Sequence, residues 1–186
     1  MAVQAAKRLF SVHDFHKMAA AGIFMPEDRI ELINGEILTR SPINSRHSGH
    51  LIRLQKVLEA LLGDRVLISA QNPLRLDAFS EPQPDLAILK PNTHFYTEHH
   101  PGPADVFWLI EISDSTLHYD RYTKLPLYAA SGIPETWIID LNKKRLECYS
   151  RPDTASGKYL DQKIITRQER VVLAGFDLDL EVGKIL

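Results

Sequence analysis

Hydrophobic residues recur every three or four positions in parts of the chain, a spacing that is typical of amphipathic helices. The longest such stretch spans residues 45–62, where leucines form the apolar face and Gly63 ends the pattern. A shorter one at 11–22 begins with a serine cap. A third helix is expected at 123–131, provided that Pro126 lies in its first turn, where the missing N–H costs no hydrogen bond. The pattern therefore predicts three helices separated by other structure.

Residues 30–39 predict a β-hairpin. Asn34-Gly35 is the favoured two-residue turn, because both positions take positive φ. One face of this hairpin carries Ile30, Leu32, Ile37 and Thr39, and the other carries Glu31, Ile33, Glu36 and Leu38. Two carboxylates that share a face with two apolar residues are unusual for a plain solvent-facing strand.

Short apolar runs predict further strands along the chain. They lie at 66–70, 74–76, 85–89, 106–112, 136–141, 145–150 and 159–166. The 106–112 run is almost wholly apolar, as in a strand that is buried on both faces. We therefore expect one α/β domain over residues 1–186, with a mixed central β-sheet flanked by helices. The motif-bearing core would span about 10–150, and 151–186 would add a strand and a short tail.

The composition narrows the class of protein without deciding its function. The chain has 186 residues, and its 22 basic and 24 acidic residues give a net charge of −2, which leaves DNA binding open. A single cysteine, Cys148, excludes an intrachain disulfide and a cysteine-based zinc site, and indicates a reducing cytoplasm. Because no apolar run approaches the ~20 residues of a membrane span, no membrane partner is expected.

Two carboxylates fall where a charge is costly. Glu111 lies inside the apolar 106–112 strand, where Phe107, Leu109 and Ser113 would share its face, and Asp85 begins the 85–89 strand. If these strands are neighbours, the two carboxylates converge at one end of the sheet and repel each other. A divalent cation such as Mg²⁺ or Mn²⁺ resolves that conflict and can activate water against a phosphodiester.

A lysine near these carboxylates would stabilise the charge that develops on a phosphate. Asp120, Lys124 and Tyr128 are spaced by four, so they would share one face of the helix that follows the Glu111 strand. Lys124 is therefore the candidate, and a solvated helix lysine is the alternative interpretation. For Asp85 and Glu111 the alternative is a structural cap with a buried ion pair, and for Glu31 it is a half-exposed hairpin charge.

Several blocks of sequence occur in an order that resembles a known family. They are residues 31–36, Ser41-Pro42 with His47, 81–88 around Pro84-Asp85, 110–113, Asp120 with 124–129, and 132–140. Together they resemble the Uma-two family of restriction-endonuclease-like proteins, within the PD-(D/E)XK nuclease superfamily. The resemblance covers about residues 10–150, and it implies a restriction-endonuclease-like core preceded by an N-terminal helix and hairpin.

The resemblance also implies a metal-dependent phosphodiesterase site. Asp85 and Glu111 would be the metal ligands, Glu31 an additional acidic member, and Lys124 the source of positive charge. The sequence departs from the superfamily at Ser113, which stands where the superfamily has its lysine. Lys124 substitutes for that lysine only if its side chain reaches back over the site.

Other polar residues have less specific roles. His47, Ser113 and Asp120 would contact substrate or support the ligands, with capping or packing an equal alternative for His47. The histidines at 94, 99 and 100 suggest zinc, but they lie in a proline-rich loop without a matched ligand set, and we favour a plain loop. The net charge is near neutral, and we expect it to be the sum of a negative metal pocket and basic residues near that pocket. Candidates for these are Arg46, Arg53 and Lys56.

The leading hypothesis is a Mg²⁺- or Mn²⁺-dependent endonuclease that hydrolyses DNA phosphodiester bonds. A non-catalytic nucleic-acid-binding or regulatory module that keeps the nuclease fold is the second hypothesis, and Ser113 motivates it. The third is a structural or oligomerisation protein with vestigial acids. Cutting both strands of a duplex needs two sites, so a symmetric homodimer is expected. The sequence contains no glycine-rich phosphate-binding loop, so no small-molecule cofactor is expected.

Overall fold

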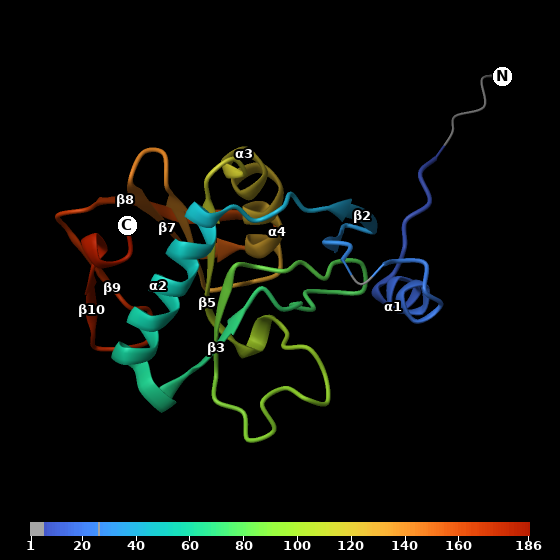
Figure 1. The fold of residues 1–186 in the computed structure, drawn as a ribbon, viewed down its shortest axis with the longest axis horizontal. Helices are drawn as coiled ribbons and strands as arrows, with labels where there is room; N and C mark the ends of the chain where they lie inside the picture. The colour runs from blue at the N-terminus through green and yellow to red at the C-terminus, as the bar shows by residue number, and fades with distance from the viewer. Residues whose placement is uncertain (1–5, 26) are drawn as a thin grey trace.

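A six-stranded sheet lies at the centre of the molecule (Figure 1). The computed structural model describes residues 6–25 and 27–186. The sheet has the order β3-β4-β5-β6-β7-β8, and of its neighbouring pairs β5 and β6 run parallel while the others are antiparallel. The bounds are β3 Leu67–Ala70, β4 Leu86–Leu89, β5 Val106–Ser113, β6 Glu135–Asp140, β7 Arg145–Asp153 and β8 Lys158–Thr166. The chain is thus a mixed α/β domain, as its element order predicts.

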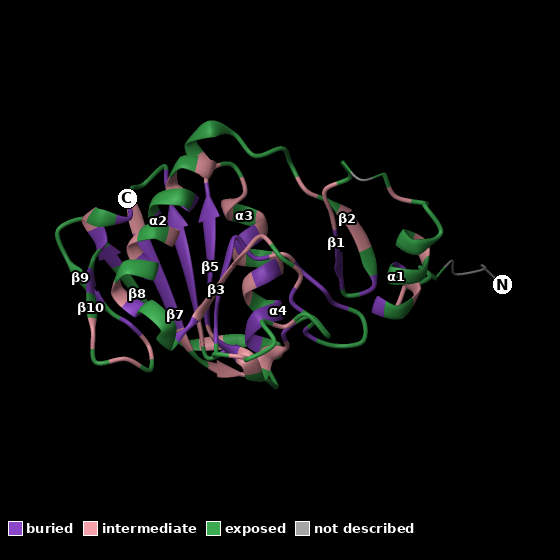
Figure 2. Cartoon of the chain, turned by 60° about the horizontal axis from the view of Figure 1, so that its bottom comes forward, coloured by how far each residue is buried: buried purple, intermediate pink, exposed green. Residues whose placement is uncertain are grey.

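Helices cover both faces of this sheet. The longest, α2 (Ser45–Leu62), packs its leucines against Trp108, Ile110 and Ile112 of β5. A helical segment connects the parallel strands β5 and β6, since such strands require a crossover. It consists of α3 (Leu117–Tyr119), the π-helical turn η3 (Asp120–Lys124) and α4 (Leu125–Ala130). On that side Leu109 of β5 packs with residues of α4. The central strands β4, β5 and β6 are almost wholly buried, as Figure 2 shows for β5, whereas the edge strands β3 and β8 are more exposed.

The N-terminal helix and hairpin form a separate layer beside the sheet (Figure 1). The helix α1 (Val12–Ala20) begins with the predicted capping box between Ser11 and Asp14. Strands β1 (Ile30–Ile33) and β2 (Glu36–Thr39) pair in the predicted register. The apolar face of Ile30, Leu32 and Ile37 packs against α1, while Ile33 joins the core shared with α4. This two-sided packing turns Glu31 toward the main domain.

The C-terminal residues form more structure than the short tail that the sequence suggests. Strands β9 (Arg170–Val172) and β10 (Asp179–Glu181) pair as a second small sheet, and the 3-10 turn η4 (Val182–Lys184) follows. Their buried residues Val171, Leu180 and Val182 join the same hydrophobic cluster as α2. The other 3-10 turns are η1 (Gly63–Arg65) and η2 (Pro103–Asp105). In the described part of the chain, no helix is long and apolar enough to cross a membrane.

Three expectations from the sequence are wrong in detail. Residues 74–76 form no strand, because their N–H groups bond across a loop. The third helix begins at Leu117 rather than 123 and contains a π turn just before Pro126. Phe107 does not share the face of Glu111, because the pairing of β4 with β5 shifts register there, and its ring packs against Phe176 at a centroid distance of 5.1 Å.

Candidate active site

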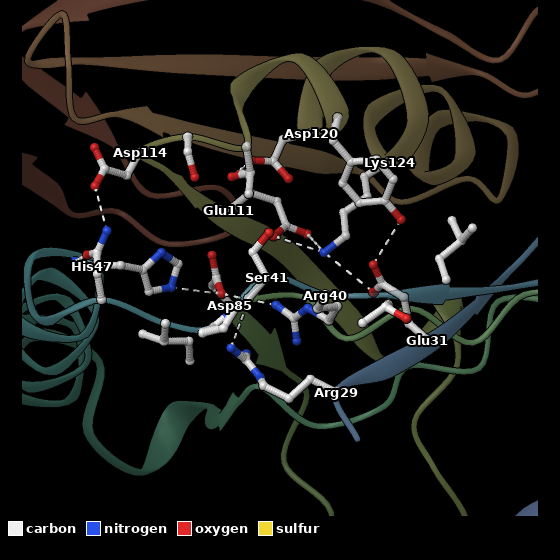
Figure 3. A pocket seen from close by; sticks show the side chains of 18 residues that line it. Arg29, Glu31, Arg40, Ser41, His47, Asp85, Glu111, Asp114, Asp120 and Lys124 are labelled. Carbon is white, nitrogen blue, oxygen red and sulfur yellow. Dashed lines mark hydrogen bonds and ion pairs between the residues drawn. The ribbon is translucent and has the colours of Figure 1, made fainter. Parts of the chain in front are cut away.

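The predicted acidic residues line one pocket of about 390 Å³ between the hairpin, the start of α2 and the ends of β4 and β5 (Figure 3). Its charged lining residues are Arg29, Glu31, Arg40, Asp85, Glu111, Asp114, Asp120 and Lys124, with His47 beside them. The acids outnumber the cations by five to three. The structure therefore brings together all four residues proposed from the sequence as catalytic, and the excess of acids makes the pocket negative when all of them are ionised.

Asp85 is fixed at the point where β4 begins. The β4–β5 register pairs Leu86 with Ile110, which places Asp85 beside the end of β5. Its Oδ2 accepts a hydrogen bond from the backbone N–H of Ile112 at 2.8 Å. Its Oδ1 lies 3.1 Å from Nε2 of His47 and 3.4 Å from the guanidinium of Arg40. The carboxylate is thus held from both strands and from the start of α2.

Glu111 is held by two side chains from the crossover segment. Lys124 Nζ lies 3.1 Å and 3.2 Å from the two carboxylate oxygens of Glu111, and the Tyr128 hydroxyl donates to Oε1 at 2.6 Å. All three side chains are buried. Lys124 therefore reaches back over β5, which is the condition on which its role as the substitute lysine depended.

Glu31 completes the acidic group from the side of the hairpin. Its Oε2 lies 3.6 Å from Lys124 Nζ and accepts a hydrogen bond from the backbone N–H of Gln83 at 3.0 Å. Its Oε1 accepts one from the hydroxyl of Tyr119 at 2.9 Å. Glu31 is only 1% exposed, so the alternative of a half-exposed hairpin charge is wrong.

The two central carboxyl groups have opposite pKa shifts. Burial raises the pKa of Glu111 to about 8, against the opposing charge of Lys124. Burial also raises the pKa of Asp85, but the hydrogen bond with His47 and the charge of Lys124 outweigh it and hold that pKa below its usual value. Near neutral pH, Asp85 is therefore ionised while Glu111 is mostly protonated. Groups whose pKa values are pushed apart in this way are typical of active sites.

Two arginines in the pocket were missed from the sequence. The backbone N–H of Arg40 bonds to the carbonyl of Arg29 at 2.6 Å, which extends the hairpin by one residue pair. Because side chains alternate between the two faces of a strand, both arginines lie on the same face as Glu31. Extending the predicted hairpin register by one residue pair would have identified them. Arg46, Arg53 and Lys56, expected beside the pocket, are not among its lining residues. Arg46 nevertheless lies beside the pocket, because it pairs with the lining residue Asp114 at 2.7 Å.

The supporting residues have specific partners. Ser113 Oγ donates to Asp120 Oδ2 at 2.6 Å, and Thr116 donates to the same oxygen at 2.6 Å. Ser113 thus fixes a second carboxylate instead of supplying positive charge. Asp120 and Lys124 are the first and last residues of the π turn, and both are buried. π turns of this kind occur frequently at functional sites. Pro126 explains the irregularity, since it cannot donate to the helix ladder.

The residues of this pocket suit a divalent cation. Asp85 and Glu111 offer hard carboxylate oxygens from neighbouring strands, which suits an ion such as Mg²⁺ that keeps waters and takes phosphate oxygens as further ligands. Burial raises the pKa of Glu111, and the nearby charges of Asp85 and Asp120 add to that rise, so the ionised form of Glu111 is costly without a further cation. A bound cation favours the ionised form of Glu111, because opposite charge lowers a carboxyl pKa.

Comparison with known proteins bears on this site. The family model of Uma2, described as "Putative restriction endonuclease", matches residues 12–183, nearly the whole chain. The chain belongs to the Uma2 family. The matched range contains every residue of the acidic pocket, and also the C-terminal hairpin that lies outside the blocks noted in the sequence.

A solved structure has a similar fold. The crystal structure of "a putative nuclease belonging to DUF820 from Anabaena variabilis ATCC 29413" superposes with a TM-score of 0.70. The alignment covers 95% of this chain and 97% of the other at 15% sequence identity, and it shows that the two proteins share a fold. A search of curated proteins finds no match. Family and fold thus agree, and the chemistry rests on the pocket itself.

Proposed function

We propose that this Uma2 protein is a Mg²⁺- or Mn²⁺-dependent endonuclease that hydrolyses DNA phosphodiester bonds. The observation that carries the proposal is the pair of buried carboxyl groups, Asp85 and Glu111, on neighbouring strands with opposite pKa shifts and with Lys124 held against Glu111. The family's description as a restriction endonuclease and the nuclease-like fold support the same reaction class.

In this proposal each side chain has a defined task. Asp85 and Glu111 would hold the cation, which supplies charge neutralisation and activation of water when bound. Lys124 lies between Glu111 and Glu31, so its ammonium group is fixed where it stabilises negative charge on a phosphate. Tyr128 and Tyr119 keep the two glutamates oriented through their hydroxyl groups.

The substrate of this proposal is DNA. Arg29 and Arg40 bring guanidinium groups to the pocket, and guanidinium groups bind phosphate oxygens in pairs. Cleavage of both strands needs two sites, so a symmetric homodimer is part of the proposal. The free, buried Cys148 fits a reducing compartment, and we place the enzyme in the cytoplasm.

A non-catalytic nucleic-acid-binding module is the alternative function, and Ser113 favours it. Its hydroxyl bonds to Asp120 and brings no charge to the Glu111 strand. Lys124 is also engaged by two glutamates and by the carbonyl of Gln83 at 3.2 Å, so it already serves as a structural counter-charge. The alternative predicts DNA binding that survives chelation and no cleavage with any metal.

Plasmid cleavage separates the two functions. Wild-type protein is incubated with supercoiled plasmid and Mg²⁺ or Mn²⁺, beside Asp85→Ala, Glu111→Ala and the exposed-site control Glu59→Ala. The endonuclease predicts cleavage by wild type and control, loss in both pocket variants, and no cleavage with EDTA. Equal behaviour of wild type and both pocket variants contradicts the catalytic proposal.

A further inference from the structure

A second cavity of about 460 Å³ shares no lining residue with the acidic pocket. Three potential metal ligands converge there from parts of the chain far apart in sequence. They are His16 of α1, Glu81 in the segment that leads to β4, and His100 in the loop between β4 and β5. One ligand atom from each lies within 4.8 Å of the other two. Three such atoms at this spacing can reach a common ion.

Glu81 is buried, and one of its two carboxylate oxygens has no partner among the described residues. Its side chain is 2% exposed, and its Oε1 lies 2.6 Å from Nε2 of His16. Its Oε2 is buried and receives no hydrogen bond from any residue that the structure describes. Burying a carboxylate oxygen without a donor is costly, and buried polar atoms of this kind call for an ion or a water. The unpaired oxygen points to a missing cation.

The backbone around the three ligands is already fixed. The N–H of Glu81 bonds to the carbonyl of Leu32 at 2.8 Å, in an isolated β-bridge to the hairpin. His16 lies on a helix whose start is held by a complete capping box. The loop end beside His100 is anchored where the Arg75 N–H bonds to the carbonyl of Pro101 at 2.9 Å. The group therefore does not depend on a freely moving loop to assemble.

The ligand chemistry differs from that of the acidic pocket. Two imidazoles and one carboxylate suit Zn²⁺ and neighbouring borderline ions, whereas carboxylate-only sites suit Mg²⁺. Three protein ligands leave a fourth tetrahedral position open to water or another ligand. We infer that His16, Glu81 and His100 form a second metal site, selective for Zn²⁺-class ions and independent of the acidic pocket.

A metal bound at this site would link three segments of the chain. It joins α1 and the β4–β5 loop to the irregular segment that leads into β4, and the connection passes through Glu81, four residues before Asp85. The histidines at 94, 99 and 100 lie in a loop, as expected, and in this inference His100 alone of the three binds the metal. Its partners lie on other segments, so spacing within the loop could not reveal them.

Cobalt titration of the full chain tests the inference. The protein is prepared without a polyhistidine tag, with excess Mg²⁺ present, and Co²⁺ binding is followed by its visible absorption. Wild type should bind one Co²⁺ that Zn²⁺ displaces. His16→Ala and His100→Ala should weaken binding by at least about a hundredfold, while the loop control His94→Ala, outside the cavity, should bind as wild type.

The outcomes separate this site from the proposed nuclease site. Because His16 and His100 are exposed, their alanine variants are expected to fold, and circular dichroism checks this. Absence of Co²⁺ binding by wild type, or unchanged binding by both variants, overturns the inference and leaves a His16–Glu81 ion pair. Loss of Co²⁺ binding in Asp85→Asn also overturns it, because the ion would then lie in the acidic pocket. Failure of DNA cleavage leaves it intact.

Discussion

Replacing Lys124 by methionine removes the charge at the centre of the acidic pocket and keeps an unbranched side chain that is only one atom shorter. Lys124 Nζ lies 3.1 Å from Glu111 and 3.6 Å from Glu31, and all three side chains are at most 2% exposed. The substitution therefore leaves two buried carboxyl groups without their cation. We expect a large loss of stability in metal-free buffer.

The magnitude follows from the distances and from the pKa of Glu111. At 3.1 Å and an effective dielectric constant of about 20, the attraction between Lys124 and an ionised Glu111 is about 5 kcal/mol. Removing one partner of a buried ion pair typically costs about 3–5 kcal/mol of folding stability. Because the pKa of Glu111 is about 8, the carboxyl is ionised at pH 9 but protonated at pH 6. The loss should be about 3–5 kcal/mol in all, because Glu31 also loses its cation. It should be larger at pH 9 than at pH 6 by at most about 1.4 kcal/mol, because without Lys124 the buried Glu111 stays protonated one pH unit above its wild-type pKa.

Urea unfolding followed by tryptophan fluorescence measures this loss, since Trp108 and Trp137 are both fully buried. At pH 9 the melting temperature should fall by on the order of 10 °C. The double variant Lys124→Met/Glu111→Gln is the matched control. It should remove the pH dependence and recover part of the lost free energy, since Glu31 still lacks its cation. A loss under about 1 kcal/mol at pH 9, or no rescue by the second substitution, would refute the ion-pair reasoning.

Three further outcomes are expected. Glu111→Gln should gain stability over wild type as pH rises from 5 to 8, by at most about 1.4 kcal/mol per pH unit in urea titrations. The folded wild type keeps the Glu111 proton up to a pKa of about 8, whereas the unfolded chain releases it near 4.5, so only wild type loses stability over this range; a flat difference contradicts this. Asn44→Ala, which removes the side-chain cap of α2, should cost about 1 kcal/mol in urea unfolding, and Asn44→Ser should not. Gly35→Ala should lower the melting temperature, because φ is +77° and the new Cβ would meet a side-chain atom at 2.7 Å, whereas Gly49→Ala in open space on α2 should not lower it.

The sequence predicts the parts of this molecule that depend on local pattern. The Asn34-Gly35 turn sets the hairpin register, and that register turns Glu31 toward the main domain. Glu111 stands out because a charge inside an apolar strand is costly, and its burial confirms the inference. Both conclusions need only neighbours along the chain and the two-residue period of a strand.

The remaining site residues depend on contacts between distant segments. Tyr119 donates a hydrogen bond to Glu31, which is 88 positions away in the sequence, and no local sequence pattern near either residue indicates this bond. The bulge that turns Phe107 away arises from pairing with β4, which no pattern within β5 reveals. His16 and His100 meet only because α1 packs beside the loop. Sequence patterns identify candidate groups, and tertiary packing decides which of them meet.

The central claim is that Asp85 acts through a divalent cation in cleaving DNA. Initial cleavage rates of a labelled duplex are measured over a Mn²⁺ titration for wild type and Asp85→Asn, which keeps the size of the side chain. The account predicts saturable, Mn²⁺-dependent cleavage by wild type and a rate at least about a hundredfold lower for the variant. Cleavage by Asp85→Asn at the wild-type rate, or wild-type cleavage that persists in EDTA, would contradict it.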